Sequence, residues 1–199
     1  ENVAAYRELL LEPLKSLYLD LQPLIESFGV LETLPRRCVC TPYTDRRFCP
    51  TEPLKNYVYL KFRQAGRETD RVGLYFDMGC DGYACGLRFY QKTTAGMRAR
   101  RDDVAARPDA YRKALLAIGD KPYLFHGEAY KRDHCPDCND PLIKNLLNRK
   151  YFSVDFLSPI NETVFSSALA DELTDNFQRL SALLQLVCEE EISFSHSDE

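Results

Sequence analysis

Three segments of this chain, residues 57–63, 72–78 and 83–90, alternate apolar and polar side chains with a period of two. Successive side chains of a β-strand lie on opposite faces of a sheet, so this pattern predicts strands that bury one face and leave the other polar. The glycines within residues 79–82 predict a turn that joins the second and third segments into a hairpin. The chain is therefore constrained to an antiparallel sheet whose apolar face needs a cover.

Amphipathic helices are expected at both ends of the chain to provide this cover. Apolar residues recur every three or four positions across residues 10–28 and again across residues 169–187. There is no internal repeat and no low-complexity linker, so we expect one α+β domain over residues 1–188, with a mainly antiparallel β-sheet flanked by these N- and C-terminal amphipathic helices. Residues 189–199 are rich in acidic side chains, and we expect them to form a disordered tail.

The rest of the chain predicts shorter elements around this frame. Residues 37–43 predict a strand, and Pro42 near its end indicates an edge strand or a bulge, because it has no N–H to donate to a ladder. After residue 90 the period changes to that of a helix, and we expect two helices at 94–107 and 108–118. Weaker signals predict an extended segment at 123–131, a short helix that opens at Asp140, and a last strand at 152–156. The predicted core consists of Val58, Leu60, Phe62, Leu74, Phe76, Leu87, Phe89, Phe152, Val154, Leu173, Phe177 and Leu180.

Charge is unevenly distributed along the chain. The whole chain has a net charge of −4, and without the five acidic residues of the tail the remaining body has a net charge of +1. Residues 36–71 contain nine Lys or Arg against four acidic residues, a local net charge of +5. This balance favours a small anionic ligand over nucleic acid, which needs a larger basic surface. Four arginines of the 94–107 helix could meet phosphates, but Asp102 and Asp103 interrupt them, so we do not expect a nucleic-acid partner.

No apolar run approaches the roughly 18 residues that a membrane-spanning helix requires, so no membrane partner is expected. The eight cysteines are spread through a chain rich in Leu, Phe and Tyr. Small secreted proteins use disulfides in place of a core, whereas this composition supports a core without them. We therefore expect reduced thiols and a cytoplasmic location. Nothing in the pattern indicates a cofactor or an oligomeric state.

Cys135 and Cys138 are separated by two residues, a spacing that suits zinc. His134 or the distant pair Cys38 and Cys40 would have to complete the ligand set. Neighbouring His134 and Cys135 do not readily serve one ion, so no metal site is expected, with Cys135 and Cys138 as weak candidates. A redox role is the other alternative, because Cys138 lies just before a predicted helix start that would lower its pKa. Plain loop thiols are the favoured interpretation.

The segment Tyr43-Thr44-Asp45-Arg46-Arg47-Phe48, followed by Pro53-Leu54-Lys55, gathers charged groups where loops meet the sheet. Its spacing resembles the signature of the domain of unknown function 2461 family. The resemblance extends to Gly86-Leu87-Arg88-Phe89-Tyr90, to Leu147-Asn148-Arg149-Lys150 and to the C-terminal helix. It implies the fold expected above, and it implies no activity.

A candidate clamp for a small anionic or phosphate-bearing ligand follows from these patterns. Lys61, Arg63 and Arg88 would share the polar face of the sheet with three aromatic rings, and Gly86 would leave a gap between them. These rings are those of Tyr59, Tyr75 and Tyr90. Guanidinium groups and ring faces suit phosphate, carboxylate or a flat base. The predicted ligand-binding residues are Asp45, Arg47, Lys55, Tyr59, Lys61, Arg63, Tyr75 and Arg88. In this arrangement Asp45 would orient Arg47.

Two alternatives use the same residues. In the first, the protein is a hydrolase-type enzyme with Asp45 as the general base on an anionic substrate. In the second, it is a protein-interaction scaffold whose basic segment meets an acidic partner. Support for an enzyme is weak, because only His126 and His134 are plausible histidine bases and no nucleophile elbow or phosphate-cradling glycine loop is present.

Overall fold

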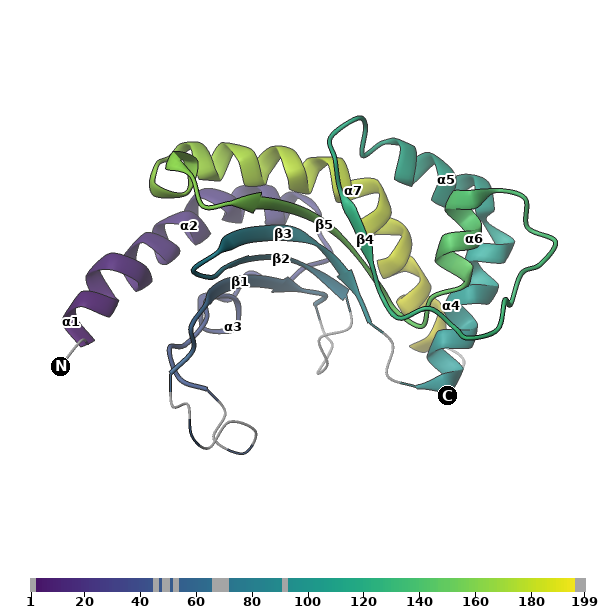
Figure 1. The fold of residues 1–199 in the computed structure, drawn as a ribbon, viewed down its shortest axis with the longest axis horizontal. Helices are drawn as coiled ribbons and strands as arrows, with labels where there is room; N and C mark the ends of the chain where they lie inside the picture. Colours follow the sequence, from purple (N-terminus) through teal and green to yellow (C-terminus); the bar gives the residue numbers. More distant parts are fainter. Residues whose placement is uncertain are drawn as a thin grey trace.

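A five-stranded antiparallel sheet lies at the centre of the described part of the chain (Figure 1). The structure is a computed structural model that describes residues 3–44, 47, 51, 54–65, 72–90 and 93–195. The strands are β1 (Val58–Arg63), β2 (Val72–Met78), β3 (Gly82–Phe89), β4 (Leu124–His126) and β5 (Phe152–Pro159). They are arranged in the order β1-β2-β3-β5-β4, and each neighbouring pair is antiparallel. The strands predicted from alternation are confirmed.

The edge strand predicted at residues 37–43 is wrong. This segment begins inside the short helix α3 (Pro35–Cys38), which starts at a proline whose fixed φ suits the first helical position. Val39 then forms a single antiparallel bridge with Leu60 of β1. The pairing does not continue as a ladder, because Pro42 has no N–H to donate.

Helices α2 (Glu12–Ser27) and α7 (Ala168–Ser195) cover one face of the sheet, as the apolar periodicity predicts (Figure 1). Helix α7 packs against β2 and β3, while α2 packs against β1 and against α7. Helix α7 continues past residue 188, so the boundary between domain and acidic tail stays a prediction. Among the described residues, no helix combines the length and apolar character needed to cross a membrane. The other described helices are α1 (Val3–Tyr6), the π-helix η1 (Arg7–Leu11), α4 (Thr94–Ala106), α5 (Pro108–Leu116), α6 (Pro141–Leu147) and the 3₁₀ helix η2 (Glu162–Phe165).

The hydrophobic core lies between the sheet and these two long helices. All twelve residues predicted for the core are buried. Phe62 of β1 stacks with Tyr18 of α2 at 6.2 Å between ring centroids and meets Phe177 of α7 edge-on at 6.3 Å. Aromatic packing thus joins both covering helices to the sheet. The result is a single α+β domain with a mainly antiparallel sheet.

Helices α4, α5 and α6 form a second group beside β4 (Figure 1). Arg100 of α4 is fully buried there, and its guanidinium donates to the carbonyl oxygen of Leu146 at 2.9 Å and to that of Arg149. Leu146 lies in the last turn of α6 and Arg149 lies just beyond its end, so Arg100 joins α4 to the end of α6. The other three arginines that could meet phosphates also contact side chains of this protein: Arg98 contacts Asp102, Arg101 contacts Tyr130, and Arg107 contacts Asp103.

Candidate functional site

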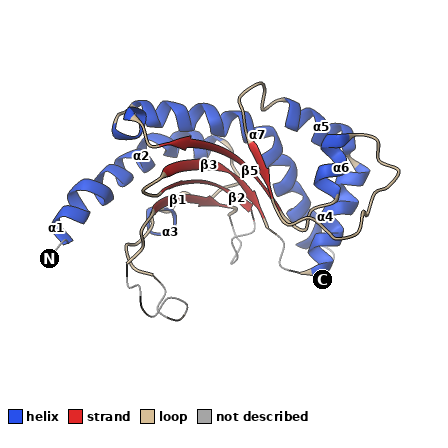
Figure 2. Ribbon diagram, viewed as in Figure 1, coloured by secondary structure: helices blue, strands red, loops and turns tan. Residues whose placement is uncertain are grey.

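The face of the sheet opposite α2 and α7 carries the polar side chains of the strands. Figure 2 shows the sheet curving with the two helices along its convex side, so we call the opposite side the concave face. The strand register aligns its residues in rows. One row consists of Lys61, Tyr75, Gly86 and Asp155, and the next row consists of Arg63, Gly73, Arg88, Ser153 and His126. Residues from four or five strands therefore meet on this face.

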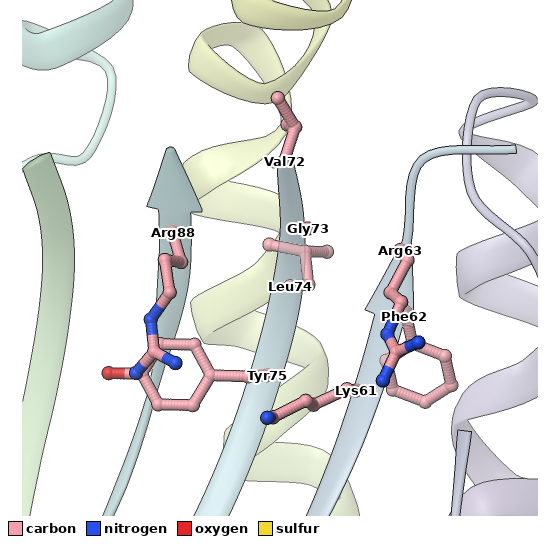
Figure 3. Close-up of a pocket in the computed structure, with 8 residues that line it drawn as sticks. All are labelled: Lys61, Phe62, Arg63, Val72, Gly73, Leu74, Tyr75 and Arg88. Carbon is pink, nitrogen blue, oxygen red and sulfur yellow. The ribbon is translucent and has the colours of Figure 1, made fainter. Parts of the chain in front are cut away.

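A hollow of about 40 Å³ lies at Gly73 on the concave face; we call it the Gly73 hollow (Figure 3). Arg63 and Arg88 are the cross-strand neighbours of Gly73 on its two sides. Lys61 and Tyr75, from the adjoining row, also line the hollow. A Cβ at Gly73 would lie 2.4 Å from a backbone carbonyl oxygen of β1, so a larger residue does not fit without a shift. The glycine thus separates two guanidinium groups without filling the space between them.

The cationic side chains of the concave face lie against aromatic rings, and the carboxylate of Asp77 shares this face with them. The guanidinium of Arg88 lies 4.6 Å from the centroid of the Tyr75 ring, and the ammonium of Lys61 lies 4.4 Å from the centroid of the Tyr59 ring. Burial raises the pKa of the Asp77 carboxyl, while the positive charges of Arg88 and Lys61 act in the opposite direction. The face therefore combines fixed positive charge with ring surfaces.

Asp155 is a buried carboxylate at the middle of the concave face. Its Oδ1 accepts a hydrogen bond from the Tyr75 hydroxyl at 2.5 Å, and its Oδ2 accepts one from the Ser153 hydroxyl at 2.8 Å. Burial and the negative charge of Asp155 raise the pKa of Tyr75, so its hydroxyl stays protonated and donates. A Cβ at Gly86 would lie 2.8 Å from Asp155 Oδ1. The gap expected at Gly86 is therefore filled by this carboxylate, and the open space lies at Gly73 instead.

His126, in the edge strand β4, lies beside the same carboxylate. Its Nδ1 is 3.1 Å from Asp155 Oδ2, and 54% of its side chain is exposed, compared with 5% for Asp155. A neutral imidazole that donates from Nδ1 carries its lone pair on Nε2. Asp155 thus holds one nitrogen of the ring, and the other nitrogen is the one that can accept a proton.

A second hollow, of about 830 Å³, lies near the start of β1, between the N-terminal helices and residues 42–43 and 54–58. Its lining is mainly apolar and includes the exposed side chains of Leu9 and Leu54. Lys55 belongs to this apolar hollow: its ammonium donates to the Thr41 carbonyl oxygen at 2.7 Å. Lys55 does not line the Gly73 hollow, whose cations are Lys61, Arg63 and Arg88.

The remaining predicted site residues are placed as follows. Asp45 lies outside the described residues. Arg47 is described and exposed, but its neighbours on both sides lie outside the described ranges. Tyr90, which we expected beside the clamp, packs edge-on against Tyr151 at 5.3 Å between ring centroids. The strand register brings together Tyr59, Lys61, Arg63, Tyr75 and Arg88 on the concave face.

Cys135 and Cys138 form a turn in the loop before α6, in which the Cys138 N–H donates to the Cys135 carbonyl at 3.2 Å. Burial raises the pKa of the Cys135 thiol, which disfavours the thiolate needed for redox chemistry. Cys38 lies in α3, which packs on β1 at the opposite edge of the sheet. Within the described residues, no group of three or more His, Cys, Asp or Glu side chains is arranged to hold a metal ion.

The sequence patterns did not identify Asp155, Ser153 or Gly73 as site residues. A signal for the first two was present, because Ser153 and Asp155 alternate with apolar residues in the predicted last strand and so belong to its polar face. His126 was considered as a base, but its neighbour Asp155 follows only from the pairing of β4 with β5.

Comparison with known proteins gives one match. The model of a family described as "Conserved hypothetical protein (DUF2461)" matches residues 1–185. No curated protein and no solved structure matches the chain.

Proposed function

The chain belongs to the conserved hypothetical protein family DUF2461, and from this premise we propose that its concave face binds a small anionic ligand. The anionic group, a phosphate or a carboxylate, would lie in the Gly73 hollow. Arg63 and Arg88 would flank it, and Lys61 would approach it from the adjoining row.

The observation that carries this proposal is the arrangement of two arginines around a glycine. Arg63 and Arg88 occupy the two positions opposite Gly73, so their guanidinium groups flank a space that has no side chain of its own. Guanidinium groups form paired hydrogen bonds with phosphate and carboxylate oxygens. Lys61 adds a third cationic side chain to the lining of the hollow.

The size of the hollow limits what it holds. A volume of about 40 Å³ accommodates roughly three water molecules at 10–15 Å³ each. That is the space of a phosphate or carboxylate group and not of a whole nucleotide. The rest of a ligand would extend over the concave face, where the ring of Tyr59 offers a flat surface next to Lys61.

A thermal-shift titration with inorganic phosphate, sulfate and citrate tests the proposal. A ligand at 100 times its Kd adds about 2.7 kcal/mol of stability, which raises the Tm of a protein of this size by roughly 5–10 °C. We expect R88A to weaken binding by roughly 10- to 100-fold, because it removes charge-assisted hydrogen bonds of about 1.5–3 kcal/mol. R88K keeps the charge but not the paired geometry, so its affinity should be intermediate.

Arg98 provides a matched control for the loss of a positive charge. Its side chain is 78% exposed on α4 and contacts only Asp102 among the ion pairs described, at 3.9 Å. R98A should therefore bind phosphate as the wild type does. The proposal is wrong if none of the three anions stabilises the wild type, or if R88A and R98A respond equally.

The enzyme alternative with Asp45 as the base rests on a residue outside the described ranges. The concave face offers a different acid–base pair, His126 and Asp155, within the same sheet as the proposed anion site.

A further inference from the structure

We propose that the apolar hollow near the start of β1 binds a fatty acid, with the acyl chain inside the hollow and the carboxylate at Lys55. This inference goes beyond the proposed function and does not depend on it, because it concerns the other hollow of the molecule. None of the residues that flank Gly73 takes part in it.

The first wall of the hollow is the N-terminal helix, where it extends past the end of the sheet. Helix α1 and the π-helix η1 continue into α2, and they project beyond the strands in Figure 1. No residue of η1 is buried by the described part of the chain, and Leu9 is 69% exposed. Positions one helical turn apart share a face, and the helix lines the hollow with Ala5, Tyr6, Leu9 and Leu10.

The opposite wall is a pair of short extended segments that precede β1. Tyr43 forms an antiparallel bridge with Leu54, and both side chains line the hollow and are exposed. The floor lies where β1 begins and β2 ends, at the paired residues Val58 and Met78. The hollow is thus bounded by a helix on one side and by paired backbone on the others, so its shape is set by regular structure.

The size of the hollow favours a small apolar molecule over a protein surface. Its volume of about 830 Å³ falls within the range of roughly 300–1,000 Å³ that is typical of small-ligand pockets. Exposed apolar side chains that are scattered singly need no explanation, but Leu9, Tyr43 and Leu54 gather around one hollow. In addition, η1 is a π-helix, a rare form that is frequent at functional sites. An acyl chain would remove water from all of these side chains.

Lys55 supplies the charge that selects a carboxylate. It lines the hollow, and its ammonium donates to the Thr41 carbonyl oxygen at 2.7 Å, with the Thr41 hydroxyl at 3.5 Å. An ammonium has three donors, so Thr41 leaves at least one of them for a ligand. Within the described ranges, no acidic side chain lies at ion-pair distance from Lys55. A carboxylate at the end of the acyl chain would therefore meet a positive charge that no described acid neutralises.

Isothermal titration calorimetry with octanoate, decanoate and dodecanoate, each below its micelle concentration, tests the proposal. Burial of one methylene group contributes about 0.8 kcal/mol, so the affinity should rise about fourfold with each added methylene. The neutral 1-decanol has the same chain as decanoate without the charge. It should bind roughly two- to fivefold more weakly, which is the effect of an ion pair near a protein surface.

Two matched pairs of variants separate the acyl chain from the carboxylate. L9Q should weaken both decanoate and 1-decanol by roughly fivefold, the equivalent of about 40 Å² of apolar surface left uncovered. Its control is L19Q, because Leu19 of α2 is 62% exposed and does not line the hollow. K55M should remove the preference for decanoate over 1-decanol. K113M should keep it, because Lys113 is an exposed residue of α5, far from α1 in Figure 1.

Cys80 reports where the fatty acid binds. It is exposed and lines the hollow, whereas Cys135 is a half-buried cysteine of the loop before α6. Saturating decanoate should slow the alkylation of Cys80 by N-ethylmaleimide and leave that of Cys135 unchanged, as measured by mass spectrometry of the two peptides. Thermal unfolding of each variant checks that it is folded.

The R88A variant separates this inference from the proposed function. R88A should bind decanoate as the wild type does, even if phosphate binding fails in every protein. The inference is wrong if decanoate does not bind, if L9Q and L19Q bind it equally, or if Cys80 is not protected. Loss of decanoate binding in R88A would instead place the carboxylate in the Gly73 hollow. Self-association of the wild type that L9Q abolishes and decanoate does not affect would show that a second copy of the chain covers the hollow, which also contradicts the inference.

Discussion

At the scale of single residues, two glycines decide what the concave face can hold. Gly73 leaves a hollow between two arginines, whereas Gly86 leaves space that the Asp155 carboxylate fills. Both glycines lie in strand interiors, where glycine has a conformational cost. The close approach of neighbouring atoms, which leaves no space for a Cβ, is the physical reason for a glycine at each position.

Replacing Gly86 should test this role. In G86A the new Cβ would lie 2.2 Å from the Val154 carbonyl oxygen and 2.8 Å from Asp155 Oδ1, so the strands must shift. We expect a loss of about 1–3 kcal/mol in the free energy of unfolding, measured by urea denaturation. Gly79 is the control, because nothing lies within 4 Å of a Cβ there. Equal stability of G86A and G79A would contradict the close packing at Asp155.

The Tyr75 hydroxyl is the second residue-scale test, and it has a pH signature. Y75F leaves buried Asp155 with one hydrogen bond fewer, which should cost about 1.5–3 kcal/mol at pH 7. Because folding raises the pKa of Tyr75, its contribution is fully present below the unfolded pKa of about 10 and is lost as pH rises above it. The stability difference between wild type and Y75F should therefore shrink above about pH 10. A difference that stays constant from pH 8 to pH 11 would show that the hydroxyl is not held by Asp155.

At the scale of elements, helix α6 depends on one side chain from α4. Arg100 donates to the carbonyls of Leu146 and Arg149, and its guanidinium also lies 5.7 Å from the centroid of the Phe152 ring of β5. A single buried arginine thus joins two helices and the sheet.

R100M should loosen this group of helices. Methionine is apolar and of similar length, but it removes the guanidinium that donates to the carbonyls of Leu146 and Arg149, which should cost about 1–3 kcal/mol. R98M removes an exposed arginine from the same helix and should change stability by less than about 0.5 kcal/mol. Chemical denaturation of the two variants measures how much Arg100 stabilises the protein. Similar denaturation midpoints for R100M and R98M would contradict a stabilising role for Arg100.

The elements also show what sequence patterns predict and what they do not. Alternation predicted β1, β2 and β3 and the shared face of Lys61, Arg63 and Arg88, because a period of two is a local property. The strand predicted at residues 37–43 was wrong, because α3 and Pro42 override a short apolar pattern. The contact of Asp155 with Tyr75 and His126 depends on strands far apart in sequence pairing as neighbours, which no local pattern reveals.

At the scale of the whole molecule, the apolar and polar faces of the sheet have separate roles. The convex face is closed by α2 and α7 and holds the core, whereas the concave face presents Arg63, Arg88 and the Asp155 network (Figure 1). The apolar hollow near the start of β1 and the Gly73 hollow near its end lie at opposite ends of the same strand. A bound ligand can therefore be assigned to one of the two hollows by the residues whose signals it changes.

Amide ¹H–¹⁵N spectra recorded during a titration with inorganic phosphate test the central claim most directly. Binding between Arg63 and Arg88 should produce saturable shifts that are largest at Gly73 and its cross-strand neighbours. The same shifts should be absent in R88A and present in R98A. Shifts centred on Leu54 and Lys55 in the apolar hollow, or no saturable shift on β1, β2 and β3, would contradict an anion site on the concave face.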